Sequence, residues 1–240
     1  MSLLRVILLR HSELKTSVLT ENSLFIWQTY NALFIVRTVL KFMVERIKEE
    51  DVVKQFNVIL PEEEEETVSM FTSFLTCLVE LVVETPTGDH TYALQLEGTR
   101  LLVVMLSPVL YSPGKPAHQL SAWREMMTGD ASVMVVPLTC GLLLRYMEQT
   151  RAPPNIMGEE GGSLVLGLAS GVWNILTLGY SSVNSSEAGD GEGGSNTPLA
   201  DISLTLMLLL VNHCTDTSAF TNPYREALFS FSNASGRERV

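Results

Sequence analysis

The feature that most constrains the fold of this 240-residue chain is a succession of apolar segments, each about as long as a helix. Prolines, glycines or clustered charges separate these segments. One segment shows the pattern clearly, because Val68, Phe71, Leu75, Leu78 and Val82 recur at steps of three and four residues. This spacing places the five side chains on one face of a helix. Such a chain must pack broad apolar helix faces against one another.

Breaks in the apolar pattern set the expected helix boundaries. Asn22 or Ser23 can cap a helix that runs to about Glu50, and Thr85-Pro86 ends the helix that contains Phe71. The other expected helices cover residues 92–111, 119–127, 131–149, 163–178, 199–214 and 223–231. No segment alternates convincingly between polar and apolar residues, so the sequence predicts an all-α fold. We expect the helices to form an armadillo- or HEAT-like α-solenoid segment, because stacked helix pairs bury apolar faces on one another.

Composition fits one helical domain over residues 1–240 and argues against some partners. Hydrophobic residues make up 46% of the chain, which is enough for a core, and the formal net charge is −11. That charge argues against binding to nucleic acid and against electrostatic attachment to anionic lipid. Part of the negative charge lies in an acidic loop at 61–66. We expect mobile linkers at about 152–162 and 181–198, where proline, glycine, serine and glutamate gather.

No group of residues has the pattern of a catalytic, metal or cofactor site. The three cysteines, Cys77, Cys140 and Cys214, are far apart in the sequence and form no Cys-x-x-Cys pair. Residues 189–194 match G-x-G-x-x-G by letter, but serines precede them where a dinucleotide-binding turn needs a strand. We therefore predict that the protein is not an enzyme, holds no cofactor or metal, and takes no small-molecule substrate.

An integral membrane protein is the alternative that the sequence leaves open. The apolar stretch from Leu164 to Tyr180 is about 17 residues long, at the lower limit for a helix that spans a bilayer. Ser163, Gly167 and Gly171 lie four residues apart, a spacing that lets membrane helices approach closely. The same spacing also suits a tightly packed helix of a soluble protein. The alternative is therefore a span near 164–180.

Three separated blocks carry a resemblance to a known family. They are Phe25 to Ile35 (Phe-Ile-Trp-Gln-Thr-Tyr-Asn-Ala-Leu-Phe-Ile), Gly167 to Trp173 (Gly-Leu-Ala-Ser-Gly-Val-Trp) and Asn222 to Arg225 (Asn-Pro-Tyr-Arg). Together they resemble the dymeclin family, and the similarity runs from about Leu3 to Asn233. The sister family of high-temperature-induced dauer-formation proteins is a weaker match.

The resemblance implies a function that composition alone does not. Dymeclin-like proteins are cytosolic, associate peripherally with Golgi membranes, and support Golgi organisation and vesicle trafficking. The resemblance therefore implies a non-enzymatic helical scaffold in the cytoplasm and at the Golgi apparatus, whose partners are proteins. It implies no catalytic residues.

Two departures from the family pattern affect what the resemblance implies. Members of the family typically begin Met-Gly, a myristoylation signal, whereas this chain begins Met1-Ser2. They also continue beyond the Asn-Pro-Tyr-Arg block with further helices. We expect a partial chain, incomplete at both ends, whose last helix pair lacks a neighbour and which tends to self-associate. Membrane attachment is then expected to depend on protein contacts.

The first and last blocks supply the candidate partner surface. Asn222 is expected to cap a helix that starts at Pro223, with Tyr224 and Phe229 packed inward. The alternative is that an exposed Tyr224 or Arg225 binds a partner. We also expect the helices that carry Trp27 and Trp173 to be buried. The candidate surface residues are Trp27, Gln28, Asn31, Asn222, Pro223, Tyr224 and Arg225.

Overall fold

The computed structural model describes residues 7–8, 13, 23–56, 70–111, 120–153, 196–212 and 221–237, with side chains to residue 231 in the last range. Within these ranges the regular elements are helices, and none is a strand. The predicted all-α class is therefore confirmed. The α-helices are α2 (Ser23–Val44), α3 (Glu49–Phe56), α4 (Met70–Glu84), α5 (Tyr92–Leu106), α6 (Pro108–Tyr111), α7 (Ser121–Thr128), α8 (Val135–Glu148), α10 (Pro198–Asn212) and α11 (Pro223–Arg237). A 3-10 helix, η2 (Asp130–Met134), leads into α8.

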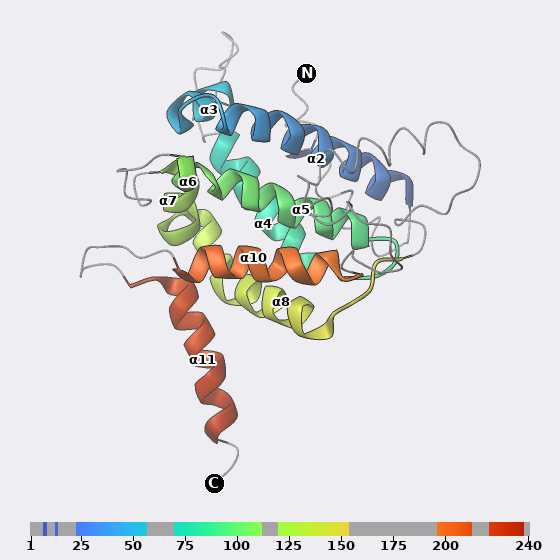
Figure 1. The fold of residues 1–240 in the computed structure, drawn as a ribbon, viewed down its shortest axis with the longest axis vertical. Helices are drawn as coiled ribbons and strands as arrows, with labels where there is room; N and C mark the ends of the chain where they lie inside the picture. The colour runs from blue at the N-terminus through green and yellow to red at the C-terminus, as the bar shows by residue number, and fades with distance from the viewer. Residues whose placement is uncertain are drawn as a thin grey trace, which may run out of the picture.

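Helix α5 lies at the centre of the arrangement (Figure 1). It packs against α2 on one side and against α4 and α10 on the other, and α10 in turn packs against α8. Helix α11 starts beside α8 and then leaves the body (Figure 1). The packed elements are helices, as predicted. The described residues do not establish the repeated helix pairs of a solenoid.

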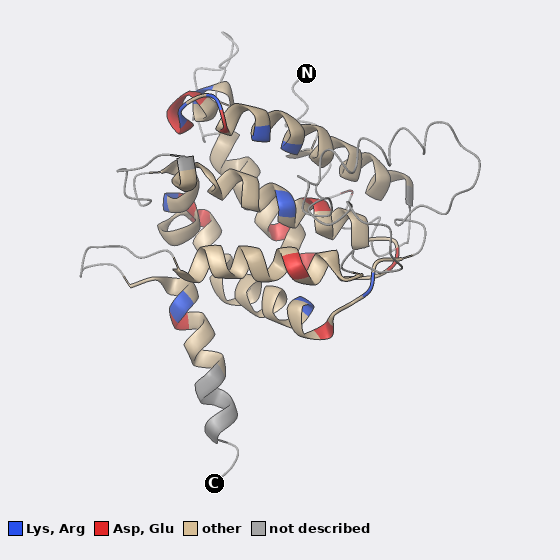
Figure 2. Ribbon diagram, viewed as in Figure 1, with Lys and Arg blue, Asp and Glu red and all other residues tan. Residues whose placement is uncertain are grey.

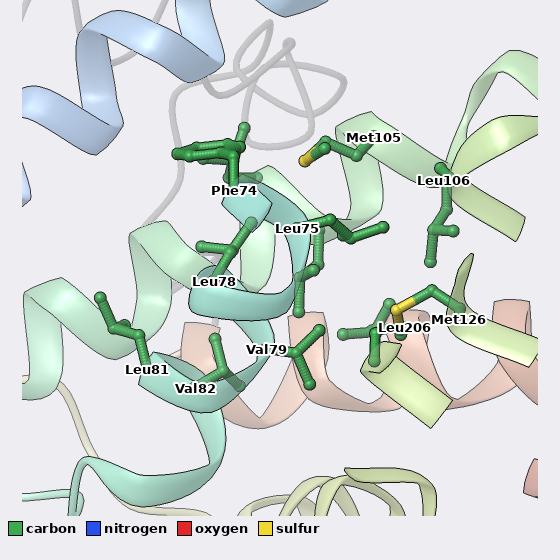
Figure 3. Packing of buried hydrophobic residues seen from close by; sticks show 14 of the residues in the cluster. Phe74, Leu75, Leu78, Val79, Leu81, Val82, Met105, Leu106, Met126 and Leu206 are labelled. Carbon is green, nitrogen blue, oxygen red and sulfur yellow. The ribbon is translucent and has the colours of Figure 1, made fainter. Parts of the chain in front are cut away.

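The core is formed where α4 meets its neighbours. Figure 3 shows the apolar side chains of α4 facing those of α5, α7 and α10. Phe74, Leu75 and Val79 of α4 are completely buried there, and so is Leu206 of α10. The indole N–H of buried Trp123 donates to the carbonyl of Leu106 at 3.0 Å, which satisfies the polar atom of a large core residue.

The helix that starts at Ser23 ends earlier than predicted. It stops at Val44 rather than near Glu50, and a new helix, α3, begins at Glu49. Acidic residues in the first turn of α3 interact favourably with the positive end of the helix dipole. The Glu49 carboxylate also accepts the backbone N–H of Ser121 at 2.8 Å, which ties this start to α7. The charged residues after Val44 therefore mark a helix start, whereas the sequence analysis assigned them to the polar end of one long helix.

Two prolines in apolar segments have different effects. Pro108 divides the predicted helix at 92–111 into α5 and α6, since it cannot donate the N–H that would continue the ladder. Pro137 lies in the first turn of α8, where the backbone N–H has no intrahelical acceptor, and the helix runs on to Glu148.

Several sequence predictions lie outside the described residues. These are the acidic loop at 61–66, the helix at 163–178 with Trp173, and most of the linkers at 152–162 and 181–198. The described residues on either side of the long gap lie together: the N–H of Ala152 donates to the carbonyl of Asn196 at 3.1 Å. The Tyr92 hydroxyl also accepts the N–H of Leu199 at 3.2 Å. The chain therefore leaves and re-enters the described fold at one place.

Candidate interaction surface

The described residues offer little for small-molecule or metal chemistry. No group of three or more His, Cys, Asp or Glu side chains within the described ranges is arranged to hold a metal ion. One small cavity lies between α2, α3, α4 and α5 and is lined mainly by apolar side chains such as Leu40, Val52, Phe56 and Met105. Its ionisable residue, Glu49, already accepts the N–H of Ser121. A ligand pocket normally has several convergent polar groups, so this cavity is better explained as imperfect packing.

The outward side of α2 is the most distinctive surface of the described fold. Leu24, Trp27, Ile35, Val39 and Phe42 recur at helical spacing, and all five are exposed. Trp27 is 64% exposed, so the expectation that the Trp27 helix is buried holds only for its opposite side. We call these five residues, with Gln28 and Asn31, the outer α2 face.

Charge on α2 is distributed against the usual pattern. Its charged side chains are Arg37, which is buried, and Lys41, which is half-buried (Figure 2). A surface helix normally directs its charges outward and its apolar stripe inward. The outer α2 face therefore runs for about five turns, from Leu24 to Phe42, without a charged side chain. Contiguous exposed apolar surface of this kind is typical of an interaction site.

A buried ion pair holds α2 in this orientation. The Arg37 guanidinium donates through Nε to the Glu97 carboxylate of α5, and the two side chains are 7% and 0% exposed. The same guanidinium lies over the Phe34 ring, 5.4 Å from its centre. Burial raises the pKa of the nearby Tyr30 phenol, and burial lowers the pKa of Arg100. This network fixes the rotation of α2, and with it the direction of the outer α2 face.

The structure brings Trp27, Gln28 and Asn31 together on the outer α2 face. Trp27 and Gln28 are exposed, and Asn31 is half-buried beside them. They were predicted as surface residues from the first signature block. The sequence analysis did not identify Ile35, Val39 and Phe42 as surface residues. The available signal was the scarcity of charge in residues 23–44, because a helix that is apolar on all sides has more apolar surface than one neighbouring layer covers.

The Asn222 to Arg225 block has a structural role. Asn222 Oδ1 accepts the N–H groups of Tyr224 at 2.9 Å and Arg225 at 3.2 Å, so the predicted N-cap is confirmed. Asn222 Nδ2 donates to the carbonyl of Leu210 at 2.7 Å, and Arg225 Nη2 donates to that of Val211 at 3.0 Å. These bonds satisfy carbonyls at the end of α10, which have no partner within their own helix.

The prediction that Tyr224 packs inward is confirmed, and the alternative of an exposed Tyr224 that binds a partner is wrong. The side chain is 1% exposed, and its hydroxyl donates to the carbonyl of Met126 in α7 at 3.1 Å. Burial raises the pKa of this phenol well above its usual value. The prediction that Phe229 packs inward is also wrong, because Phe229 is 60% exposed.

Two described stretches are long and apolar enough to cross a membrane, judged by length and composition alone. They are Tyr92–Leu110 and Asp130–Glu148. The first is the central helix of the fold, and 61% of its window is buried in protein, which is typical of a soluble core helix. The predicted span near 164–180 lies outside the described residues.

Comparison with known proteins identifies the family. The sequence profile described as "Dymeclin: Dyggve-Melchior-Clausen syndrome protein" matches residues 1–239. Dymeclin of Xenopus laevis is 36% identical over 244 residues, and the match covers 97% of this chain and 36% of the relative. Dymeclin of Mus musculus is 34% identical over 249 residues with the same coverage. Dymeclin of Drosophila melanogaster is 28% identical over 271 residues, which cover 95% of this chain and 38% of the relative.

No solved structure matches this chain significantly. The chain spans little more than a third of the length of the curated relatives it matches. The profile nevertheless covers almost every residue, and the helices it spans here include both the Trp27 block and the Asn222 block. The chain therefore belongs to the dymeclin family.

Proposed function

We propose that this chain is part of a non-enzymatic helical scaffold that associates peripherally with the Golgi and supports Golgi organisation and vesicle trafficking. Family membership supports the general assignment. The observation that carries the proposal is the outer α2 face, which is apolar, exposed and free of charged side chains from Leu24 to Phe42. A scaffold needs such a surface, because it acts by holding partners and not by converting a substrate.

The chemistry of this face indicates the class of partner. A basic group lies at the end of this face, where the Arg46 guanidinium is 3.8 Å from the centre of the Phe42 ring. The rest of the face is uncharged and the net charge of the chain is −11, so the face is unsuited to nucleic acid or to anionic lipid headgroups. A protein with a complementary apolar strip, such as an amphipathic helix, would bury Trp27 and Ile35 without burying a charge. In this proposal the chain works in the cytoplasm, and its Golgi association runs through protein contacts.

We also propose that the helices belong to an armadillo- or HEAT-like stack. The support is the order of packing, in which α2 contacts α5, α5 contacts α10, and α10 contacts α8. In a stack of this kind each layer is stabilised by its neighbours, and an outer layer keeps an apolar face. The outer α2 face is then one end of the stack.

The proposal is tested with a paired substitution on the outer α2 face. Trp27→Ser combined with Ile35→Ser removes two exposed apolar side chains of this face, and Leu110→Ser with Leu208→Ser removes two exposed leucines elsewhere. Both pairs are exposed in the free chain, so circular dichroism is expected to show unchanged helix content. Proximity labelling in cells should then lose a defined set of Golgi proteins with the first pair and retain it with the second.

Two results contradict the proposal. Identical labelling by the wild type and the Trp27→Ser/Ile35→Ser variant would exclude the outer α2 face as the partner site. Retention of the wild-type chain in the membrane pellet after alkaline carbonate extraction would instead favour an integral membrane protein, since peripheral proteins are released by that treatment.

A further inference from the structure

We draw no further inference here: the strongest candidate, the exposed apolar strip along α8 that includes Val136, Leu144 and Met147, carries none because nothing in the structure shows what covers it.

Discussion

The ion pair between Arg37 and Glu97 is expected to be the most sensitive polar contact in the described fold. Replacing Glu97 with alanine leaves the Arg37 guanidinium buried between α2 and α5 without its counter-charge. It also removes a carboxylate that raises the pKa of Arg100. Burial already destabilises the charged form of the Arg100 guanidinium. The substitution therefore leaves two poorly solvated positive charges where the native fold has a compensated cluster.

The expected loss follows from burial. Glu97 is 0% exposed and the Arg37 side chain is 7% exposed, so solvent cannot replace the lost partner. Removing one member of a buried pair lowers the free energy of unfolding by about 3–5 kcal/mol. A domain of this size has about 5–15 kcal/mol in total. We therefore expect Glu97→Ala to lose a large part of the stability and to release α2 from the body.

Urea denaturation followed by circular dichroism measures this effect. The control is Asp51→Ala, which breaks the Asp51–Lys54 pair at 2.8 Å, where the side chains are 50% and 72% exposed. The loss should be a small fraction of that expected for Glu97→Ala, because an exposed pair and a first-turn acid each contribute little in solvent. Combining Arg37→Met with Glu97→Ala should recover much of the loss, because no charge is then left unpaired. A loss below about 1 kcal/mol for Glu97→Ala would refute the argument that this pair is desolvated.

Other substitutions test the remaining contacts, each measured by urea denaturation. Tyr224→Phe should cost about 1–2 kcal/mol, because the carbonyl of Met126 loses its buried donor. Burial raises the pKa of Tyr224 in the folded state. The stability that its protonated phenol contributes is therefore complete below about pH 10, the pKa in the unfolded chain, and is lost as the pH rises further. The Tyr224→Phe variant should lose stability less steeply above about pH 10. Asn222→Ala should cost about 1–2 kcal/mol, since it removes the cap of α11. Gly141→Ala, with nothing within 4 Å of its Cβ, should gain about 0.5–1 kcal/mol, whereas Gly98→Ala should fall short of that gain, because its Cβ would lie 3.1 and 3.3 Å from α4 side chains that must move.

Local sequence signals were sufficient to predict the helical class, α4 and the cap of α11. Spacing at three and four residues identified α4, and Thr85-Pro86 marked its end. Asn222 followed by Pro223 identified the start of α11, because an amide cap and a fixed φ both act within one turn. These interactions involve neighbours in the chain, so no knowledge of the tertiary packing was needed.

The direction that each helix faces could not be predicted in the same way. Trp27 and Tyr224 are both large aromatic residues in signature blocks, yet Trp27 is exposed and Tyr224 is buried. Tyr224 packs in the apolar core, and its hydroxyl can be buried there because Met126, about a hundred residues earlier, offers an acceptor. The break after Val44 likewise depends on a bond between Glu49 and Ser121. Such long-range contacts are absent from a local hydrophobic pattern, which is why the sequence left an exposed, partner-binding Tyr224 open as an alternative.

The orientation of α2 and α8 can be explained by their buried arginines. A guanidinium is stabilised in the interior only where acceptors are fixed, as the Glu97 carboxylate and the Val82 carbonyl are for Arg37 and Arg145. Once those acceptors set the rotation of each helix, the apolar residues on the opposite side must face outward. The exposed strips are therefore a consequence of specific polar anchoring, and substitutions that remove either arginine should also change which residues a partner can reach.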